Sequence, residues 1–384
     1  MRPREAASAL ASIAAQYPVV TITGPRQSGK TTLAKQIFAE HRYVSLEDPD
    51  VAAFARTDPR GFLDDMGEKA ILDEIQREPP LLSYLQRRVD EDPTRGRYIL
   101  TGSQNLALGH GVSQSLAGRT GLLTLLPFTL REAWGDRPAD LDTTVFRGFY
   151  PRIHDRDLEP SQALAFYVAT YVERDVRSLS HIQDLTRFQT FLGLCAGRTA
   201  QILNYSDLAA DAGISVNSAK NWISVLEASY LVRRLMPYHA NISSRLSKSP
   251  KLYFLDVGLA AWLLGIRDPS QLRNHPLRGA LFETMMVAEA WKAGENAADP
   301  SQLFYYRDST QREIDLVQET GSGLDLFEIK SGRTVTTDWF KHLAWGRAHL
   351  ERVDACHLVY GGDERRVQSG IHIHPWTESG FWRR

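Results

Sequence analysis

The sequence predicts an α/β protein with more than one domain. Its 384 residues, of which 43% are apolar, can fill two or three ordinary cores. Between residues 18 and 127, short β-branched runs alternate with helical patterns, which is typical of a parallel sheet covered by helices. A second alternation of helical and strand patterns lies between residues 277 and 360, so the two ends of the chain predict separate α/β domains.

The net charge and the cysteine content limit the classes of protein to which this chain can belong. The formal net charge is -1, so no overall basic excess points to nucleic acid, and any such surface must be local. Cys195 and Cys356 are the only cysteines and lie far apart, which argues against a disulfide framework and suits a reducing cytosol. The sequence contains no signal-type segment and no apolar run of about 20 residues. We therefore expect a cytoplasmic protein that does not enter a membrane.

The first chemical signature lies between a predicted strand at residues 18–23 and a predicted helix at residues 32–38. Residues 24–31 match the pattern G-x-x-x-x-G-K-[ST], whose backbone N–H groups cradle phosphates at a helix N-terminus. Lys30 would reach the β- and γ-phosphates, and Thr31 would offer its hydroxyl to Mg²⁺. The alternative is a glycine-rich turn that merely contains these residues. The predicted nucleotide-binding set is Gly24, Pro25, Arg26, Gln27, Ser28, Gly29, Lys30, Thr31 and Thr32.

The next predicted strands end in polar residues that suit a nucleotide site. After a strand at residues 43–46, the run at residues 70–74 ends in Asp73 and Glu74. Asp73 would hold Mg²⁺, directly or through water, and Glu74 would polarise the attacking water, the alternative being a solvated acidic turn. A further strand at residues 97–103 brings Ser103 or Gln104 to the same end of a parallel sheet, where either could contact the γ-phosphate.

Arg119 directly precedes the last predicted strand of this domain, residues 120–127. From there its guanidinium could reach a nucleotide bound by a neighbouring subunit and neutralise charge in the transition state. As an exposed arginine it could equally form a surface ion pair.

These motifs together resemble those of AAA+ type ATPases. Leu-Thr-Gly-Ser at residues 100–103, Ser-Leu-Ala-Gly-Arg at 115–119 and Tyr-Val-Glu-Arg-Asp-Val at 171–176 are similar to a widespread family of bacterial and archaeal ATPases whose C-terminal domain has long lacked an assigned function. The resemblance covers nearly the whole chain. It implies ATP hydrolysis with Mg²⁺ in a homo-oligomeric ring, with Ser103 as a sensor and Arg119 as an arginine finger. The reaction that hydrolysis drives stays open.

The middle of the chain predicts a helical lid and then a helix-turn-helix. Residues 128–180 are mostly helical in pattern, and their Arg174 either faces nucleotide or pairs within its helix. Residues 205–213 and 214–226 read as two helices joined by a glycine turn, the second capped by Ser215, and residues 230–238 alternate like the strand of a wing. The second helix would offer Asn217, Ser218, Lys220 and Asn221 to a DNA groove or backbone.

Local charge favours DNA at this helix-turn-helix only weakly. Residues 205–252 carry six basic residues, which include Lys220, Arg245, Lys248 and Lys251, against three acidic ones. Winged helices also serve as protein interfaces, so a protein partner is the alternative to DNA.

The last part of the chain carries the second chemical signature. A helix at residues 277–291 with Glu283 is followed by strands at 303–306, 313–317 and 324–330, a helix at 339–350 and a strand at 355–360. Glu328 and Lys330 are two apart on a strand, so their side chains point to the same face. His275, His342 and His349 lack the spacing and the cysteine partners of a metal site, which favours solvated or core histidines.

This order and spacing resemble the PD-(D/E)XK nuclease core. The resemblance implies that Asp315 and Glu328 bind Mg²⁺ or Mn²⁺, that Lys330 assists the nucleophilic water or stabilises the phosphorane, and that Glu283 supports the metal site. A hard cation held by carboxylates is chemically suited to activating water beside a phosphate. The same fold also occurs without cleavage, and Glu-Ile-Lys is an ordinary strand triplet.

The combined prediction is a P-loop AAA+ type ATPase with a helical lid, a winged helix-turn-helix and a restriction-endonuclease-like C-terminal domain. The expected boundaries are residues 1–128, 129–185, 186–245 and 246–384. We expect an ATP-hydrolysing, DNA-processing protein that acts on duplex or branched DNA. The alternatives are a non-cleaving motor that migrates branches or opens strands, and a regulatory ATPase switch that binds protein partners.

Overall fold

The computed structural model describes residues 2–103, 115–172, 184–239, 249–300, 302–378 and 380–382. Gln104, Arg174, Arg245 and Lys248 lie outside these described residues. The chain forms two compact units. The N-terminal unit comprises Met1–Phe128 with Ala228–Tyr230 and Glu295–Asp299, and the C-terminal unit comprises Thr129–Glu227, Leu231–Gly294 and Pro300–Arg384. The predicted division into four domains stays a prediction.

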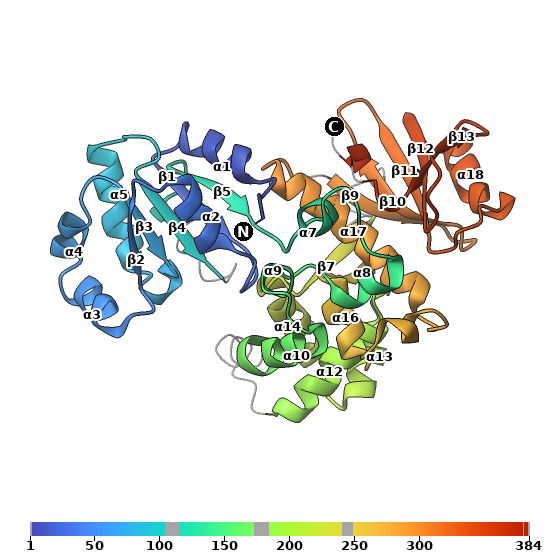
Figure 1. Ribbon diagram of the computed structural model, residues 1–384, viewed down its shortest axis with the longest axis horizontal. Coiled ribbons are helices and arrows are strands. Elements are labelled where there is room, and N and C mark those ends of the chain that lie inside the picture. The colour runs from blue at the N-terminus through green and yellow to red at the C-terminus, as the bar shows by residue number, and fades with distance from the viewer. Residues whose placement is uncertain are drawn as a thin grey trace. The chain divides into compact units, whose positions relative to one another are not determined.

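The N-terminal unit is built on a five-stranded sheet in the order β2-β3-β4-β1-β5, seen in blue and cyan in Figure 1. Every pairing in this sheet is parallel, which confirms the predicted parallel α/β arrangement. The central strand β1 is buried along its whole length, as its β-branched, apolar sequence predicts. The strands are β1 (Val19–Thr23), β2 (Arg42–Ser45), β3 (Ala70–Asp73), β4 (Tyr98–Gly102) and β5 (Thr120–Thr124).

Helices cover both faces of this sheet. Apolar residues of α1 and α2 pack with Val20, Ile22 and Ile99 on one face, and those of α3, α4 and α5 pack with Leu72 and Leu100 on the other. Proline begins both α3 and α4, where its missing N–H costs no hydrogen bond. The helices are α1 (Ala7–Ala14), α2 (Lys30–Ile37), α3 (Pro49–Thr57), α4 (Pro59–Asp65), the short η1 (Ile75–Arg77) and α5 (Leu81–Glu91).

The C-terminal unit contains a nine-stranded sheet in the order β13-β14-β12-β11-β10-β9-β7-β8-β6. The strands next to the predicted helix-turn-helix therefore belong to the same sheet as the strands of the C-terminal part, through the parallel pairing of β7 with β9. The strands are β6 (Gln201–Ile202), β7 (Val232–Pro237), β8 (Lys251–Phe254), β9 (Gln302–Arg307), β10 (Glu313–Glu319), β11 (Leu324–Lys330), β12 (Val353–Tyr360), β13 (Arg366–Gln368) and β14 (Ile371–Pro375).

The four helices predicted individually in the C-terminal unit are present at Tyr205–Ala212, Val216–Ala228, Arg278–Asn296 and Lys341–His349, whereas those at Leu185–Gly197 and Val257–Leu263 were not predicted. The order α17, β9, β10, β11, α18, β12 matches the predicted helix-strand-strand-strand-helix-strand order. The strands β6, β8, β13 and β14 were not predicted. The helices are α7 (Leu130–Trp134), α8 (Leu141–Arg147), α9 (Pro151–Asp155), α10 (Pro160–Tyr167), the π-helix η2 (Val168–Val172), α12 (Leu185–Gly197), α13 (Tyr205–Ala212), α14 (Val216–Ala228), α16 (Val257–Leu263), η3 (Pro269–Leu272), α17 (Arg278–Asn296), η4 (Thr337–Phe340), α18 (Lys341–His349) and η5 (Gly380–Trp382).

The predicted pair of helices, α13 and α14, has the local signals that define its turn. Gly213 ends α13 in the left-handed conformation at φ 63°, and the backbone N–H of Ser218 donates to the hydroxyl of Ser215 at the start of α14. Trp222 on α14 packs edge-on against Phe188 and Phe191 of α12, which fixes the buried face of the helix.

Two smaller expectations concern the cysteines and the membrane. Cys195 and Cys356 are both free and buried, as small apolar residues would be. Within the described ranges, no helix combines the length and the apolar character needed to cross a bilayer.

Candidate functional site

The loop after β1 has the backbone shape of a phosphate-binding loop. Gly24 has φ 143°, and a Cβ atom at this position would lie 2.2 Å from the carbonyl oxygen of Leu125, so only glycine fits. Gly29 stands in the left-handed region at φ 90° and directly precedes α2, whose N-terminus therefore faces the loop. The buried hydroxyl of Ser28 has no hydrogen-bond partner among the described residues, which leaves a polar atom inside the loop available to a ligand.

Lys30 and Arg4 hold this loop from two sides. The Lys30 ammonium donates to the carbonyl oxygens of Gly24 and Pro25, at 3.0 and 2.7 Å, so it lies within the loop that it is predicted to serve. Arg4 donates from one nitrogen to the carbonyl of Ser28 at 2.5 Å and from another to the carbonyl of Leu126 at 2.8 Å. The N-terminal segment therefore ties the loop to the chain that follows β5.

Asp73, at the end of β3, accepts three side-chain hydrogen bonds in the candidate nucleotide site. Its Oδ1 accepts hydrogen bonds from the hydroxyl of Thr31, at 2.8 Å, and from that of Thr101. Its Oδ2 accepts from the hydroxyl of Tyr43 at 3.0 Å. Burial, with the adjacent Asp73 carboxylate, raises the pKa of Tyr43 to about 12, so this phenol remains a donor at neutral pH. The oxygens of Thr31 and Asp73 form a hard donor set that suits Mg²⁺.

Glu74 lies beside Asp73 but its side chain has different partners. Its backbone is left-handed at φ 56°, which turns the chain sharply after β3. Its Oε2 accepts from the hydroxyl of Ser103 at 3.2 Å and from the amide of Gln76. The structure therefore brings the predicted pair Glu74 and Ser103 together, and adds Gln76 to them.

Arg119 is paired within its own chain. Its guanidinium donates to both carboxylate oxygens of Asp90 on α5, at 2.5 and 2.9 Å, while about a third of its side chain, 34%, stays exposed. The pKa of Asp90 is lowered by this hydrogen bond from Arg119. Of the other predicted residues, Arg26 lies 3.8 Å from Glu47, and Thr32 is exposed on the first turn of α2.

A second group of charged side chains lies in the C-terminal unit, on β8, α17, β10 and β11. The antiparallel register that pairs Leu316 with Phe327 places Asp315 beside Glu328 on the next step of the ladder. The backbone N–H of Ile329 donates to Asp315 at 2.7 Å and fixes that carboxylate. We call this group the carboxylate–lysine cluster, and it consists of Lys251, Glu283, Glu313, Asp315, Glu328 and Lys330.

Each lysine of the cluster bridges two carboxylates. Lys330 lies 3.0 Å from Asp315 and 2.6 Å from Glu328, as expected for side chains on one face of the sheet. Lys251 lies 3.0 Å from Glu283 and 2.6 Å from Glu313. The predicted residues Glu283, Asp315, Glu328 and Lys330 are thus brought together, and two further charges join them.

Burial shifts the protonation of the cluster. Burial raises the pKa of Glu328 to about 8, and the nearby Asp315 carboxylate adds to the effect. Burial likewise raises the pKa of Glu283 to about 7, although the Lys251 ammonium opposes the shift. For Lys251, burial would lower the pKa, but the surrounding carboxylates of Glu283, Asp315 and Glu313 outweigh it and raise the pKa. Burial would also lower the pKa of Lys330, but the carboxylates of Asp315 and Glu328 outweigh it and raise the pKa, so both lysines stay charged.

The cluster fits a divalent cation only in part. Asp315 and Glu328 supply the carboxylate oxygens that Mg²⁺ and Mn²⁺ prefer, and Oε2 of Glu328 is buried without a hydrogen-bond partner in the described structure. Glu283, in contrast, already accepts from Lys251 and, at 2.6 Å, from the hydroxyl of Tyr253. In the part of the chain that the structure describes, no three His, Cys, Asp or Glu side chains are grouped as metal ligands.

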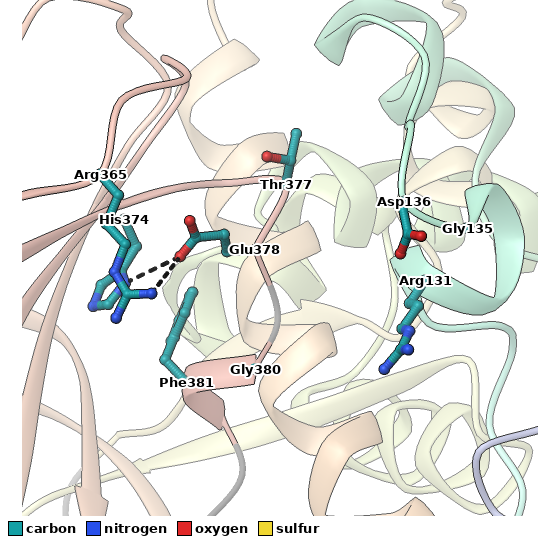
Figure 2. A pocket seen from close by; sticks show the side chains of 9 residues that line it. All are labelled: Arg131, Gly135, Asp136, Arg365, His374, Thr377, Glu378, Gly380 and Phe381. Atoms are coloured by element: carbon teal, nitrogen blue, oxygen red, sulfur yellow. Dashed lines mark ion pairs between the residues drawn. The ribbon is translucent and has the colours of Figure 1, made fainter.

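A cavity of about 620 Å³ lies elsewhere in the C-terminal unit (Figure 2). Glu378 lies on its wall, 3.8 Å from Arg365 and 3.7 Å from His374. Burial, with the charge of Arg365, lowers the pKa of His374 to about 4, so this histidine is neutral at pH 7. No predicted site residue lines the cavity, whose wall mixes both signs of charge: Arg131, Gly135, Asp136, Arg365, His374, Thr377, Glu378, Gly380 and Phe381.

The predicted DNA-facing helix, α14, presents a polar face. Asn217, Lys220 and Asn221 are exposed, Ser218 is half-buried, and Trp222 is on the buried face. One of the basic residues expected to add positive charge near this helix does not do so. The side chain of Lys251 is 2% exposed and bonded to carboxylates, so it adds no positive charge to the surface.

Several residues of both sites were not predicted from the sequence. Thr101 stands two residues before Ser103 on β4, and the alternation of a strand could have drawn attention to it. Arg4, Tyr43 and Lys251 belong to no motif and reach their partners only through the tertiary fold.

Comparison with protein families divides the chain into three matched regions. A family profile described as an AAA domain matches residues 16–134, which include the phosphate-binding loop, Asp73 and Arg119. Residues 138–270 and 278–378 match two further profiles, described as domains of unknown function, DUF8612 and DUF4143. The N-terminal unit is therefore an AAA-type P-loop domain.

Similar proteins occur in mycobacteria. The uncharacterized protein Rv2008c of Mycobacterium tuberculosis is 31% identical over 365 residues, which cover 94% of this chain and 80% of the relative. The uncharacterized protein Mb2031c of Mycobacterium bovis matches to the same extent, with 31% identity over 365 residues, 94% of this chain and 80% of the relative. Among solved structures, the Walker-type ATPase PABY2304 of Pyrococcus abyssi matches at 15% identity and a TM-score of 0.46, over 67% of this chain and 94% of that one.

Proposed function

Because the chain belongs to the family of the mycobacterial proteins Rv2008c and Mb2031c and carries an AAA domain, we propose that it hydrolyses ATP to process DNA. The observation that carries the proposal is the direct hydrogen bond between Thr31 and Asp73, which unites the two motifs that a P-loop ATPase requires. Both hydroxyl and carboxylate stand at the C-terminal edge of a parallel sheet, where such enzymes bind nucleotide.

The residues of the N-terminal unit divide the work of hydrolysis between them. The loop at residues 24–31 and Lys30 bind the phosphates of ATP, and Thr31 and Asp73 would hold Mg²⁺, which neutralises charge on the β- and γ-phosphates. Glu74 orients the attacking water, for which it must exchange its bonds with Ser103 and Gln76 for one to water. In a homo-oligomeric ring, Arg119 would leave Asp90 and approach the nucleotide of the neighbouring subunit.

The proposed substrate is duplex or branched DNA, held by a winged helix-turn-helix built from α13, α14 and the strands β7 and β8. The support is the exposed polar face of α14, where Asn217, Lys220 and Asn221 lie on one side of a helix whose other side is anchored by Trp222. The two free, buried cysteines suit the cytoplasm, where we place the reaction.

The test is ATPase activity of the full chain, titrated at low salt with single-stranded, duplex and branched DNA. We expect at least one DNA structure to stimulate turnover, and Lys30→Ala to abolish it, while Lys69→Ala, which changes an exposed lysine of the same unit, should leave turnover unchanged. Lys220→Glu should weaken DNA binding and lower its salt dependence, whereas Lys341→Glu on α18 should not. Turnover that no DNA affects, with no DNA bound, would instead favour a regulatory switch with a protein partner.

The role of the carboxylate–lysine cluster in this function is to grip or to cut DNA. Asp315 and Glu328 would hold one Mg²⁺ or Mn²⁺, which activates water for attack on phosphate, and Lys330 would assist that water. The specific observation that favours a non-cleaving DNA motor is the engagement of Glu283 by Lys251 and Tyr253. Incubation of wild type and Asp315→Ala with duplex and branched DNA in Mn²⁺ separates the two: cleavage lost in the variant supports a nuclease, and strand separation without cleavage supports the motor.

A further inference from the structure

The carboxylate–lysine cluster has an inner and an outer half. Lys251 begins β8, and its side chain is 2% exposed, whereas the side chain of Lys330 at the end of β11 is 32% exposed. The inner half consists of Lys251 with Glu283 and Glu313, and the outer half of Lys330 with Asp315 and Glu328. The carboxylates show the opposite order, because Glu283 and Glu313 are 14% and 26% exposed and Asp315 and Glu328 are 9% and 6% exposed. The halves therefore differ in whether their lysine can move into solvent.

The inner half already contains the cation that its carboxylates need. The Lys251 ammonium lies 3.0 Å from an oxygen of Glu283 and 2.6 Å from an oxygen of Glu313, and the hydroxyl of Tyr253 donates to the same Glu283 oxygen at 2.6 Å. Side chains of β8 pair and hydrogen-bond Glu283, and Glu313 lies 3.4 Å from Arg307 of β9 as well as beside Lys251, so neither carboxylate lacks a cationic partner. A divalent ion bridging Glu283 and Glu313 would occupy the position of this ammonium.

The outer half is less complete. Lys330 bonds to one oxygen of Asp315 and one of Glu328, while the second oxygen of Glu328 is buried without a partner among the described residues. An unpartnered, buried carboxylate oxygen costs free energy that a bound cation would recover. The part-exposed Lys330 can swing into solvent and leave Asp315 and Glu328 to one ion, whereas the buried Lys251 cannot leave Glu283 and Glu313.

We propose that Lys251 is the resident cation of the cluster, so that the C-terminal unit binds at most one divalent ion, through Asp315 and Glu328, and Glu283 is not one of its ligands. The identity of the ion rests on the proposed DNA-processing function, whereas the role of Lys251 rests on its contacts with Glu283 and Glu313. Lys251 is a positioning residue: it holds Glu283 and Glu313 in place and keeps the cluster folded when no metal is bound.

The experiment uses the full chain without nucleotide, so that the phosphate-binding loop does not contribute a second metal site. Thermal unfolding is recorded in EDTA and in Mn²⁺, and the number of bound Mn²⁺ ions is measured by calorimetry. Wild type should bind no more than one ion and should keep its Tm in EDTA. Lys251→Met, which keeps length but removes charge, should lower Tm in EDTA by on the order of 10 °C and gain stability in Mn²⁺ as the ion enters the inner half. Lys341→Met, an exposed lysine of the same unit, should behave as wild type.

Glu283→Gln keeps the proposal testable if Lys251→Met fails to fold. Because Glu283 is not a ligand, this variant should bind Mn²⁺ with wild-type affinity, whereas a lost ligand would weaken binding by about ten-fold or more. Two ions in wild type, loss of wild-type stability in EDTA, or weakened Mn²⁺ binding by Glu283→Gln would each overturn the role of Lys251. If wild type is stable in EDTA and binds no Mn²⁺, the role of Lys251 as resident cation is supported, but the metal site is removed from the proposed function. This outcome distinguishes failure of the proposed function from failure of the role of Lys251.

Discussion

The hydroxyl of Thr31 donates to Oδ1 of Asp73 across 2.8 Å, so the first turn of α2 and the end of β3 are joined by a direct bond. The two residues are 42 positions apart in the chain, and each was assigned to Mg²⁺ from a different motif. Their contact supports reading the two motifs as one site, and it makes the contribution of each residue measurable.

Asp73→Asn should separate nucleotide binding from hydrolysis. The amide keeps the shape of the side chain but removes the negative charge that would hold Mg²⁺, so we expect turnover to fall by about 100-fold or more while ATP still binds. Steady-state ATPase rates and equilibrium binding of ATP measure the two effects. Asp50→Asn, on the exposed first turn of α3, is the matched control and should change neither. Undiminished hydrolysis by Asp73→Asn would remove Asp73 from the site.

Arg4→Ala should weaken ATP binding more than it slows turnover. Arg4 supports the loop through the carbonyls of Ser28 and Leu126 without standing among the predicted reacting groups, so its loss should raise KM by about ten-fold with a smaller change in kcat. Arg4→Lys keeps the charge but loses the forked donor geometry, and should recover only part of the affinity. Arg60→Ala, exposed on α4, is the control. Unchanged KM in Arg4→Ala would show that the loop keeps its shape unaided.

Arg119→Ala should abolish turnover only if the arginine acts on a neighbouring subunit. A mixture of Arg119→Ala with Lys30→Ala chains then regains activity, because each variant supplies the group that the other lacks at a shared interface. Asp90→Ala breaks the exposed pair with Arg119 and should leave turnover at or above the wild-type rate, since such pairs contribute little stability. Mixed chains that stay inactive, or full activity in Arg119→Ala, would leave Arg119 as an ordinary surface residue.

The C-terminal unit should lose stability as the pH rises from about 5 to 8. Burial raises the pKa of Glu328 from 4.5 in the unfolded chain to about 8 in the folded protein. Between these two pH values the folded state holds a proton that the unfolded chain has released. This contribution to the free energy of unfolding is therefore fully present below pH 4.5 and is lost as the pH rises through the folded-state pKa. Glu328→Gln should flatten this slope, by on the order of a few kcal/mol across the range. Urea unfolding at several pH values measures it, with Glu351→Gln, an exposed residue, as the control. An identical slope in Glu328→Gln would mean that the carboxyl is ionised throughout.

The sequence predicted those parts of the structure that depend on neighbours in the chain. The loop at residues 24–31 is defined by glycines at fixed positions, and the end of β3 at Asp73 follows from an apolar run, so the parallel sheet brings the two together. Likewise, the period of two along β11 placed Glu328 and Lys330 on one face.

The parts that the sequence did not predict depend on contacts between distant segments. Arg4 meets Ser28 across 24 positions, and Lys251 meets Glu283 across 32, with no pattern that links either pair. Lys251 also opens a strand of only four residues, too short for a clear alternation, and a lysine before such a run is ordinarily a surface residue. The pairing of β8 with both β7 and β6 places Lys251 inside the sheet.

The nine-stranded sheet makes the C-terminal unit hard to divide by proteolysis or by gene truncation. A cut after residue 245, at the predicted boundary, would separate β7 from both β8 and β9, and β7 would then carry unpaired backbone groups on both of its edges. The same cut would place Lys251 on the later fragment, and β6, which precedes α13 and α14, would lose its pairing with β8. Fragments made at that boundary should therefore aggregate, and any exchange of α13 and α14 between relatives would have to include the following strands.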